Sequence, residues 1–309
     1  VVRELLDLRK HYKGLMKEAD DPDVALGYNM LQMAVKVSVN AIYGLCALSM
    51  LQGGWVSKAI AESITYLGRR SCSMLVEKSE ELGYPGLAGH TDSCYIQVPF
   101  EKAEWLSEHL TSVAQDEMGM KHLDVELEAY FPYWFTADTK NRNFGVKSWP
   151  EDEAGKMKVT GYALKASNTP AFAKGILQEA LYAVGSGKDE NELHAMLRPM
   201  VMRVYRGEVD VMEASSSGRI SKAPSAYENS VPNPARAAVY VEGVPDGNAA
   251  TPVVAIQNQE GEPLNIEGFD IAWSTLVEKW IGKKLKSVYK NMQWDLDAVT
   301  ARRVPVKMW

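Results

Sequence analysis

Cysteine is scarce in this sequence, and positive charge is not in excess. The 309 residues include only Cys46, Cys72 and Cys94, with no C-x-x-C pair, so neither a disulfide framework nor a zinc site is predicted. This composition fits a reducing, intracellular setting. Thirty-four basic and forty acidic residues give a net charge of −6, which argues against a uniformly basic, histone-like binder of nucleic acid. A local basic cleft stays compatible with that charge.

Long apolar runs are also lacking. The least charged stretch, residues 27–56, is interrupted by Lys36 and several amides, so no membrane span is predicted. No signal peptide precedes it, and the chain begins with Val inside a helical pattern, from which we expect further residues upstream. The length and the 46% apolar content favour two or three packed lobes.

Helical periodicity dominates the first third of the chain. A basic amphipathic helix is predicted over residues 2–18. The Asp-rich break with Pro22 favours the start of a second helix that runs to about Gly44. The two helices should form a hairpin. A third helix is predicted after the Gly53-Gly54 break and should end at Gly83.

Strand patterns come next. Residues 87–98 are predicted to form a strand-turn-strand, because apolar and polar side chains alternate within this segment and residues 89–92 supply a tight turn. Residues 101–120 are predicted helical and residues 122–149 as further strands, with Gly145 and Gly161 flanking a hairpin. A helical C-terminal lobe should start at Thr169-Pro170. Loops and short elements are expected over residues 215–234 and 244–263, and a helix pair over residues 271–292.

Two sets of polar side chains each share a helix face. Arg9 and Lys13 lie four residues apart on the first helix, and Lys36, Asn40 and Tyr43 follow at i, i+4 and i+7 on the second. Facing helices would gather three cations, which suits a polyanion. A solvated basic face is the alternative. Binding is favoured because Lys36 lies within an apolar helix, where an unpaired cation is costly.

Asp92 follows the turn between the two strands. From such a place its carboxylate could reach a divalent ion. The alternative is a turn-forming Asp that bonds its own backbone. His90 is interpreted as a turn residue, because no second His or Cys stands at metal-ligand spacing.

Several segments, in order, resemble family B DNA polymerases. K-V-S-V-N-A-I-Y-G at 36–44 resembles the family's K-x-x-x-N-S-x-Y-G motif, and G-H-T-D-S at 89–93 resembles its Y-G-D-T-D-S motif. Residues 8–13 resemble the first fingers helix, and residues 61–69 resemble A-x-S-I-T-x-x-G-R. The remaining similar segments are K-N-R-N at 140–143, like the primer-binding K-K-R-Y; 158–170, like the palm-to-thumb junction of phage replicative enzymes; and 220–238, like the thumb.

The resemblance implies a role for each matching residue. Arg9, Lys13 and Lys36 would bind the incoming deoxynucleoside triphosphate, and Asn40 and Tyr43 would line the nascent base-pair pocket. In addition, Lys140 and Arg142 would hold the primer-template DNA. As the metal ligand, Asp92 would bind two Mg²⁺ ions, one activating the primer 3′-hydroxyl and the other steadying pyrophosphate.

The chain also departs from the family pattern. Ala41 replaces Ser, His90 replaces the first Asp of the Asp92 motif, and Asn141 and Asn143 replace Lys and Tyr of the primer motif. The D-x-x-S-L-Y-P-S motif with the partner carboxylate is missing, and so is any 3′-5′ exonuclease motif. Glu128, on a segment that resembles a palm strand, is not assigned as a replacement ligand. Because two bridging carboxylates are needed, this chain alone is predicted to be inactive.

These observations predict an α+β fold with right-hand polymerase architecture. The predicted lobes are a helical fingers hairpin at 1–47, a palm with an antiparallel sheet at 48–164 and a mainly helical thumb at 165–309. The predicted function is template-directed DNA synthesis in DNA replication, with an N-terminal polymerase half supplying the missing Asp and the exonuclease. A split polymerase and a truncated one both fit. The expected location is the cytoplasm of a host cell, with a viral origin.

Two alternatives stay open. The first is a non-catalytic subunit that binds primer-template DNA and descends from such a polymerase, favoured by His90 and the weakened primer motif. The second is an RNA-templated polymerase with a similar palm, against which the K-x-x-x-N-x-x-Y-G segment argues.

Overall fold

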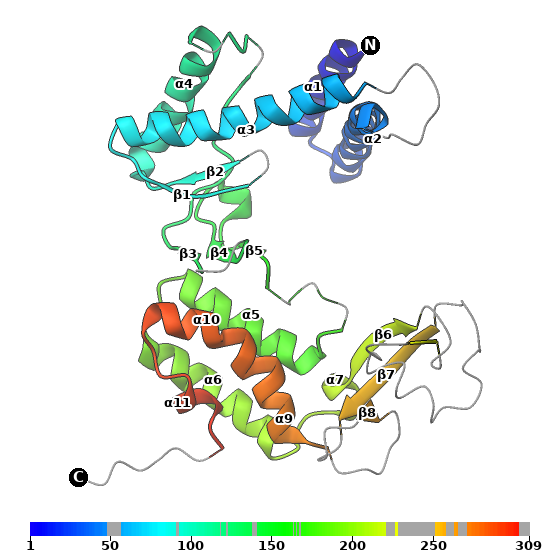
Figure 1. Ribbon diagram of the computed structural model, residues 1–309, viewed down its shortest axis with the longest axis vertical. Helices are drawn as coiled ribbons and strands as arrows, with labels where there is room; N and C mark the ends of the chain where they lie inside the picture. Colours follow the sequence, from blue (N-terminus) through cyan, green and yellow to red (C-terminus); the bar gives the residue numbers. More distant parts are fainter. Residues whose placement is uncertain are drawn as a thin grey trace. The chain divides into compact units, whose positions relative to one another are not determined.

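The chain folds into two compact units, residues 1–125 and 126–309, in a computed structural model (Figure 1). The residues that the structure describes are 1–47, 57–90, 93–117, 119–121, 123–137, 141–162, 164, 166, 168–220, 226–227, 251–257, 263–264 and 271–302. Helices and small antiparallel sheets confirm the predicted α+β class. The boundaries of the three predicted lobes stay a prediction.

A helical hairpin opens the first unit, as predicted. Helix α1 spans Val2–Glu18 and helix α2 spans Pro22–Ala47, so the second helix runs past Gly44. At the break, Asp21 Oδ1 accepts a hydrogen bond from the backbone nitrogen of Asp23 at 2.8 Å, the capping role expected of an Asp.

The rest of the first unit packs around helix α3. This helix spans Lys58–Glu81, and Gly83 follows it with a φ of +84°, the left-handed conformation that stops a helix. Strands β1 (Gly86–Gly89) and β2 (Cys94–Ile96) pair antiparallel, and α4 spans Phe100–Asp116. The unit's described buried apolar cluster is small and consists of Met74, Val113 and Ala114.

The second unit starts with a three-stranded antiparallel sheet in the order β3-β4-β5. Its strands are Trp134–Thr136, Asn143–Val146 and Met157–Thr160, with the short helix η1 at Glu151–Glu153. The prediction for residues 122–149 is thus only partly right, because residues 123–129 form neither helix nor strand. Gly145 lies inside β4 rather than beside the hairpin. A Cβ at this position would lie 2.7 Å from the ring of Trp134, so the position requires glycine.

Helices build the large core of this unit. Helix α5 spans Ala171–Gly185, where the sequence predicted a helical start, and its apolar face is buried at Phe172, Ile176, Leu177, Ala180 and Leu181. Helices α6 (Glu190–Tyr205) and α7 (Val211–Ala214) follow, although the sequence did not single them out. The buried cluster that these helices share with β4 and the C-terminal helices includes the fully buried side chains of Leu181, Leu193, Leu197 and Ile281.

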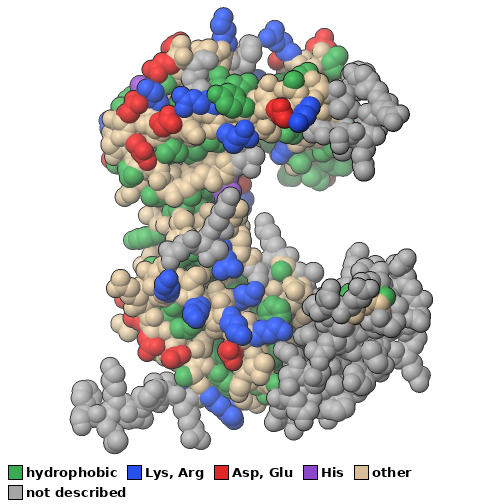
Figure 2. All heavy atoms as spheres, viewed as in Figure 1, with side chains coloured by type: hydrophobic (Ala, Val, Ile, Leu, Met, Phe, Trp, Pro, Cys, Tyr) green, Lys and Arg blue, Asp and Glu red, His purple; other side chains and the backbone are tan. Residues whose placement is uncertain are grey.

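The C-terminal elements complete the second unit. Strands β6 (Ser216–Ile220), β7 (Thr251–Gln257) and β8 (Pro263–Leu264) form a second antiparallel sheet. The expected helix pair at 271–292 is wrong, because α9 (Trp273–Val277), the π-helical turn η4 (Glu278–Gly282) and α10 (Lys283–Met292) form one continuous run. Gly282 has helical angles and does not interrupt it. Helix α11 spans Asp297–Thr300, and Figure 2 shows Lys and Arg side chains gathered over α10.

Candidate nucleotide- and nucleic-acid-binding site

The α1–α2 hairpin holds Arg9 against the second helix. The Nε atom of Arg9 donates to Oε1 of Gln32 at 3.3 Å, and Nε2 of Gln32 donates to Oδ1 of Asn29 at 2.8 Å. The Gln32 side chain is buried between the helices. This Gln was missed by sequence reasoning, although it stands one helical turn before Lys36, and it fixes the direction of the Arg9 guanidinium.

The register of the hairpin spreads the three predicted cations along it. Arg9 lies beside Gln32, and the rings of Tyr12 and Tyr28 stack with centroids 6.4 Å apart, so the helices run antiparallel. Lys13 therefore lies one turn to one side of the Arg9 contact and Lys36 one turn to the other. At a rise of 1.5 Å per residue, the outer two are separated by about 12 Å along the helix axis. The three cations form a row, which suits an extended polyanion.

Lys36 is solvent-exposed, as are Asn40 and Tyr43, whereas Lys13 is half-buried. The expectation that the charge of Lys36 lies in an apolar environment is therefore wrong. Its neighbours in the sequence are apolar, but this face of α2 is exposed to solvent. Among the described residues, no carboxylate forms an ion pair with Lys13 or Lys36. The positive charge of the row is available to a ligand from solution.

The strand pair β1–β2 carries the predicted metal motif. Gly89 pairs with Cys94, and the backbone nitrogen of His90 donates to the carbonyl of Ser93 at 2.8 Å. The strand-turn-strand prediction is thus confirmed for the residues on either side, while Asp92 itself lies outside the described residues.

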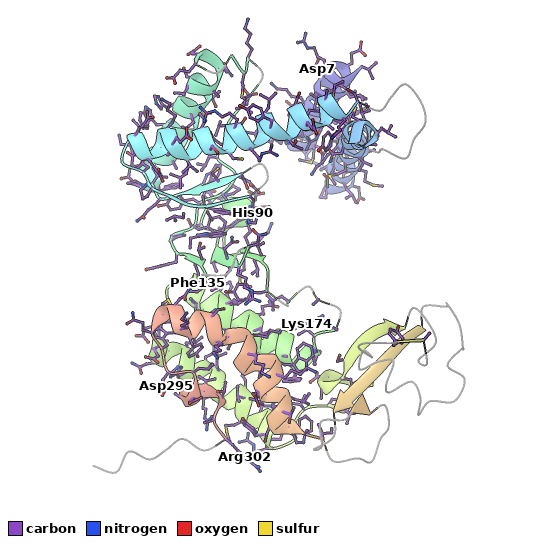
Figure 3. The ribbon with its side chains drawn as sticks, in the orientation of Figure 1. Asp7, His90, Phe135, Lys174, Asp295 and Arg302 are labelled. Atoms are coloured by element: carbon purple, nitrogen blue, oxygen red, sulfur yellow. The ribbon has the colours of Figure 1, made fainter. Side chains whose placement is uncertain are left out.

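His90 lies at the end of β1 with its ring edge-on to that of Tyr95, at 6.1 Å between centroids (Figure 3). Its Nε2 is buried without a hydrogen-bond partner in the described part of the chain. The side chain is thus more than a solvated turn residue. Beside it, Cys94 Sγ contacts the carbonyl of Cys72 at 3.5 Å on α3, and burial raises the pKa of the Cys94 thiol to about 11. That thiol stays protonated and packs the strand pair on the helix.

The segment predicted to bind the primer lies at the turn into β4 of the second unit. Lys140 falls outside the described residues, but the carbonyl of Arg142 accepts a hydrogen bond from Ala137 at 2.9 Å, and the Arg142 side chain is half-buried. Gly161, with a φ of +74°, approaches this turn so closely that a Cβ would lie 2.0 Å from the Asn141 carbonyl oxygen. A glycine is therefore required where the sheet supports Arg142.

The described residues alone do not form a metal-binding site. In the ranges that the structure describes, no group of three or more His, Cys, Asp or Glu side chains is placed to hold an ion. Glu128 pairs with Lys158 at 3.3 Å on a partly exposed surface. The donor set for two ions is incomplete in this part of the chain.

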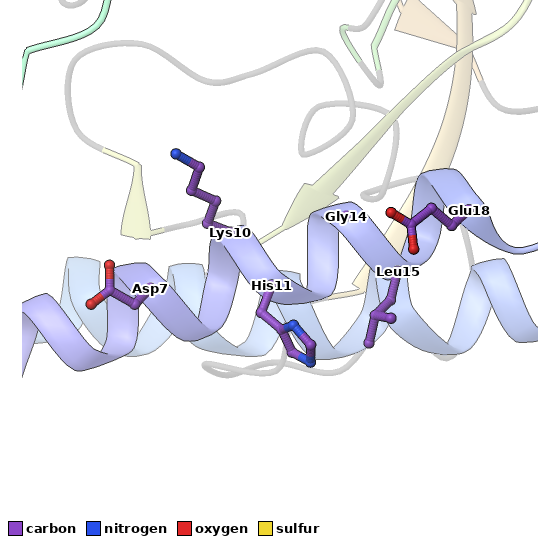
Figure 4. Close-up of a pocket in the computed structure, with 6 residues that line it drawn as sticks. All are labelled: Asp7, Lys10, His11, Gly14, Leu15 and Glu18. Carbon is purple, nitrogen blue, oxygen red and sulfur yellow. The ribbon is translucent and has the colours of Figure 1, made fainter.

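A hollow of about 410 Å³ lies on α1 (Figure 4), lined by Asp7, Lys10, His11, Gly14, Leu15 and Glu18. These residues lie on the opposite face of the helix from Arg9 and Lys13. Two carboxylates against one lysine make it a poor place for a phosphate. The hollow does not belong to the predicted site.

The sequence matches the family model described as DNA polymerase family B over residues 1–246. The chain therefore belongs to DNA polymerase family B. It is 27% identical over 247 residues to DNA polymerase 1 of Saccharolobus solfataricus, covering 77% of this chain and 26% of that protein. It is also 30% identical over 210 residues to the DNA polymerase of Paramecium bursaria Chlorella virus NY2A, covering 61% of this chain and 22% of that protein. The chain spans about a quarter of the length of these relatives.

The fold comparison agrees. The family B DNA polymerase from Pyrobaculum calidifontis superposes with a TM-score of 0.61 at 18% identity, covering 99% of this chain and 38% of that one. That likeness extends the shared fold past residue 246 to the C-terminal helices. No helix in the described ranges is long and apolar enough to cross a membrane.

Proposed function

We propose that this chain is the fingers, palm and thumb portion of a DNA-directed DNA polymerase. The observation that carries the proposal is the row formed by Arg9, Lys13 and Lys36, displayed on an exposed hairpin within a chain of this family. Fingers at 1–47, palm at 48–164 and thumb at 165–309 are the proposed lobes. The relatives named DNA polymerases support the reaction class.

In this proposal the hairpin binds the incoming deoxynucleoside triphosphate. Arg9 is the fixed member, because Gln32 orients its guanidinium, which can grip phosphate oxygens in a fork. Lys13 and Lys36 neutralise the phosphates to either side of it, and Asn40 and Tyr43 line the nascent base-pair pocket. In the second unit, Lys140 and Arg142 hold the primer-template DNA. Their joint task is positioning and charge neutralisation.

Two Mg²⁺ ions are the proposed cofactors, with Asp92 as their ligand in this chain. Such ions activate the primer hydroxyl and neutralise the leaving pyrophosphate. The described residues do not complete a site for them, and the sequence lacks the D-x-x-S-L-Y-P-S segment. We therefore propose that an N-terminal polymerase half supplies the partner carboxylate and that this chain alone is inactive.

Primer extension tests the proposal. The chain is assayed with Mg²⁺, four deoxynucleotides and primer-template, first alone and then with the polypeptide that carries the D-x-x-S-L-Y-P-S segment. The role of Asp92 is supported if the two polypeptides together extend the primer and this chain by itself does not. That extension should be lost with Asp92→Ala and kept with Asp20→Ala in the exposed α1–α2 turn. Loss of activity with both substitutions, or neither, overturns the role of Asp92.

The nucleotide-binding row has its own readout in the same assay. Lys36→Ala should raise the KM for deoxynucleotides by about tenfold or more, as expected when one charge-assisted phosphate contact is lost. Lys17→Ala, an exposed cation in the last turn of α1, is the matched control. Equal KM values for the two variants would contradict a role for Lys36 in triphosphate binding.

A non-catalytic DNA-binding subunit is the second candidate, and His90 favours it. An imidazole stands where the family has a carboxylate, and its Nε2 is buried without a partner in the described residues. A well-folded pair that binds primer-template but does not extend it would favour this candidate. The viral relatives support the further proposal that the chain is virus-encoded and acts inside a host cell.

A further inference from the structure

Two cysteines meet where helix α3 packs on the strand pair β1–β2 of the first unit. Sγ of Cys94, the first residue of β2, lies 3.5 Å from the backbone carbonyl oxygen of Cys72 on α3. Sγ of Cys72 in turn lies 3.7 Å from the carbonyl oxygen of His90, and the two thiols hydrogen bond to each other. We call Cys72 and Cys94 the α3–β2 thiol pair.

The fold holds both members of the thiol pair in place. Cys94 pairs with Gly89 in the antiparallel ladder, and the hydrogen bond from His90 to the carbonyl of Ser93 closes the strand pair beside it. On the helix, Met74 follows two residues after Cys72 and is buried in the core of the unit. A disulfide requires two sulfur atoms that can approach to about 2.05 Å. Thiols held in contact by two packed elements are the starting geometry for that bond.

The thiol pair is also accessible. Both side chains are half-buried, so a small reagent can reach the sulfur atoms, unlike those of fully buried structural cysteines, which are inert. The third cysteine, Cys46, is half-buried as well but lies on α2. In a reducing cell, disulfides are usually transient and serve catalysis or redox sensing. A single pair in contact suits redox sensing and does not require a disulfide framework.

We propose that Cys72 and Cys94 form a reversible, redox-sensitive disulfide that links β2 to α3. The oxidant is a low-molecular-weight disulfide such as oxidised glutathione. One cysteine sulfur attacks this disulfide, forms a mixed disulfide and releases one small thiol, which carries away the first cysteine proton. The second cysteine sulfur then displaces the other small thiol, which carries away the second proton. The two cysteines are thereby oxidised and the small disulfide is reduced to two thiols.

The link would restrain the segment that carries the predicted metal ligand. Cys94 stands two residues after Asp92 in the sequence, so fixing Cys94 to α3 holds one end of that turn. The two cysteines are 22 residues apart, and joining them removes conformational freedom from the unfolded chain. By linkage, the folded chain should favour the disulfide over the unfolded chain by the same factor that the disulfide favours folding. For a loop of this length we expect a factor of about tenfold or more.

Equilibration in glutathione buffers tests the proposal. The full chain is brought to equilibrium at graded ratios of oxidised to reduced glutathione, once folded and once in concentrated urea. Long incubation is needed because the raised pKa of the Cys94 thiol slows exchange. After alkylation and digestion, mass spectrometry should find a peptide that joins Cys72 to Cys94. Its equilibrium constant should be about tenfold or more larger for the folded chain.

Cysteine variants make the test specific. Cys46→Ser should leave the joined peptide and its equilibrium constant unchanged, whereas Cys94→Ser should leave only glutathione adducts at Cys72. A joined peptide that contains Cys46 overturns the proposal. So do separate glutathione adducts on Cys72 and Cys94 of the folded chain without a link, and a ratio of folded to unfolded constants below about tenfold.

Hydrogen exchange on the unmodified chain is a second readout that needs no variant. Backbone amides of β1 and β2 should exchange more slowly after oxidation and regain their original rates with a dithiol reductant, because the link restrains the strand pair on α3. Helix α5, in the other unit, is the internal control and should not change. Equal rates in the oxidised and reduced chain would show that no such restraint exists. Neither readout uses primer extension, so both outcomes stand whether or not the polymerase proposal holds.

Discussion

Gly161→Ala should destabilise the second unit by more than its backbone conformation alone explains. A φ of +74° costs an alanine about 1–2 kcal/mol. Its Cβ would in addition lie 2.0 Å from the carbonyl oxygen of Asn141 and 3.0 Å from Cγ of Arg142. Backbone has to move to relieve the first contact, which adds about 1–3 kcal/mol. We expect the free energy of unfolding to fall by about 2–5 kcal/mol in total.

Gly155→Ala is the matched control for this prediction. Gly155 has a similar φ of +81°, yet a Cβ there would meet only the Tyr182 hydroxyl, at 4.0 Å, so only the cost of about 1–2 kcal/mol is expected. Urea unfolding is followed by tryptophan fluorescence, since five described tryptophans lie in the second unit. If the two variants unfold at the same urea concentration, the close approach of Gly161 to the Arg142 turn is refuted.

Three further predictions concern the same unit. Asp189→Ala should cost about 1 kcal/mol in urea unfolding, because Asp189 and Glu192 exchange backbone hydrogen bonds of 2.9 and 3.0 Å at the start of α6; an unchanged midpoint would contradict the capping role. Leu181→Ala, at a fully buried position of α5, should cost about 3–5 kcal/mol, and a loss below about 1 kcal/mol would show that the core is loosely packed. The hydrogen bond from Lys147 lowers the pKa of Glu153, so the Lys147–Glu153 pair stabilises the fold above the unfolded pKa of about 4.3, and this stabilisation is lost as pH falls through the lower folded pKa. In urea unfolding from pH 6 to 3, the free energy of unfolding of Lys147→Gln should therefore fall less steeply with acid than that of the unmodified chain. Parallel curves for the two proteins would refute this link.

The helices were the most predictable part of the fold. Helix α1 has the predicted bounds, and Gly83 ends α3 where a left-handed residue was expected. Both are local signals, an apolar period and a residue with special backbone freedom. The run from Trp273 to Met292 was harder: the sequence predicted a helix pair, whereas Gly282 has helical angles and Trp280 and Ile281 pack in the core of one continuous run.

Contacts between distant residues could not be read from the sequence. Gln32 orients Arg9 across 23 residues, and only the hairpin register brings them together. The approach of Gly161 to Asn141 likewise depends on the pairing of β4 with β5. Period and motif identify which side chains share a face, but the neighbour on the facing element depends on register, which is fixed by the packing of the whole unit.

For Lys36, the sequence motif and the expected burial support the proposed triphosphate-binding role in different ways. Its proposed role rested partly on the cost of a cation in an apolar helix, yet the residue is exposed. Exposure suits the role better, because a triphosphate arrives from solution and has to reach its cations. A buried lysine would need its own counter-charge in the free protein, and a ligand would have to displace that partner. Arg9 fits the same logic: Gln32 is neutral, so it orients the guanidinium without cancelling the charge that the phosphates would meet.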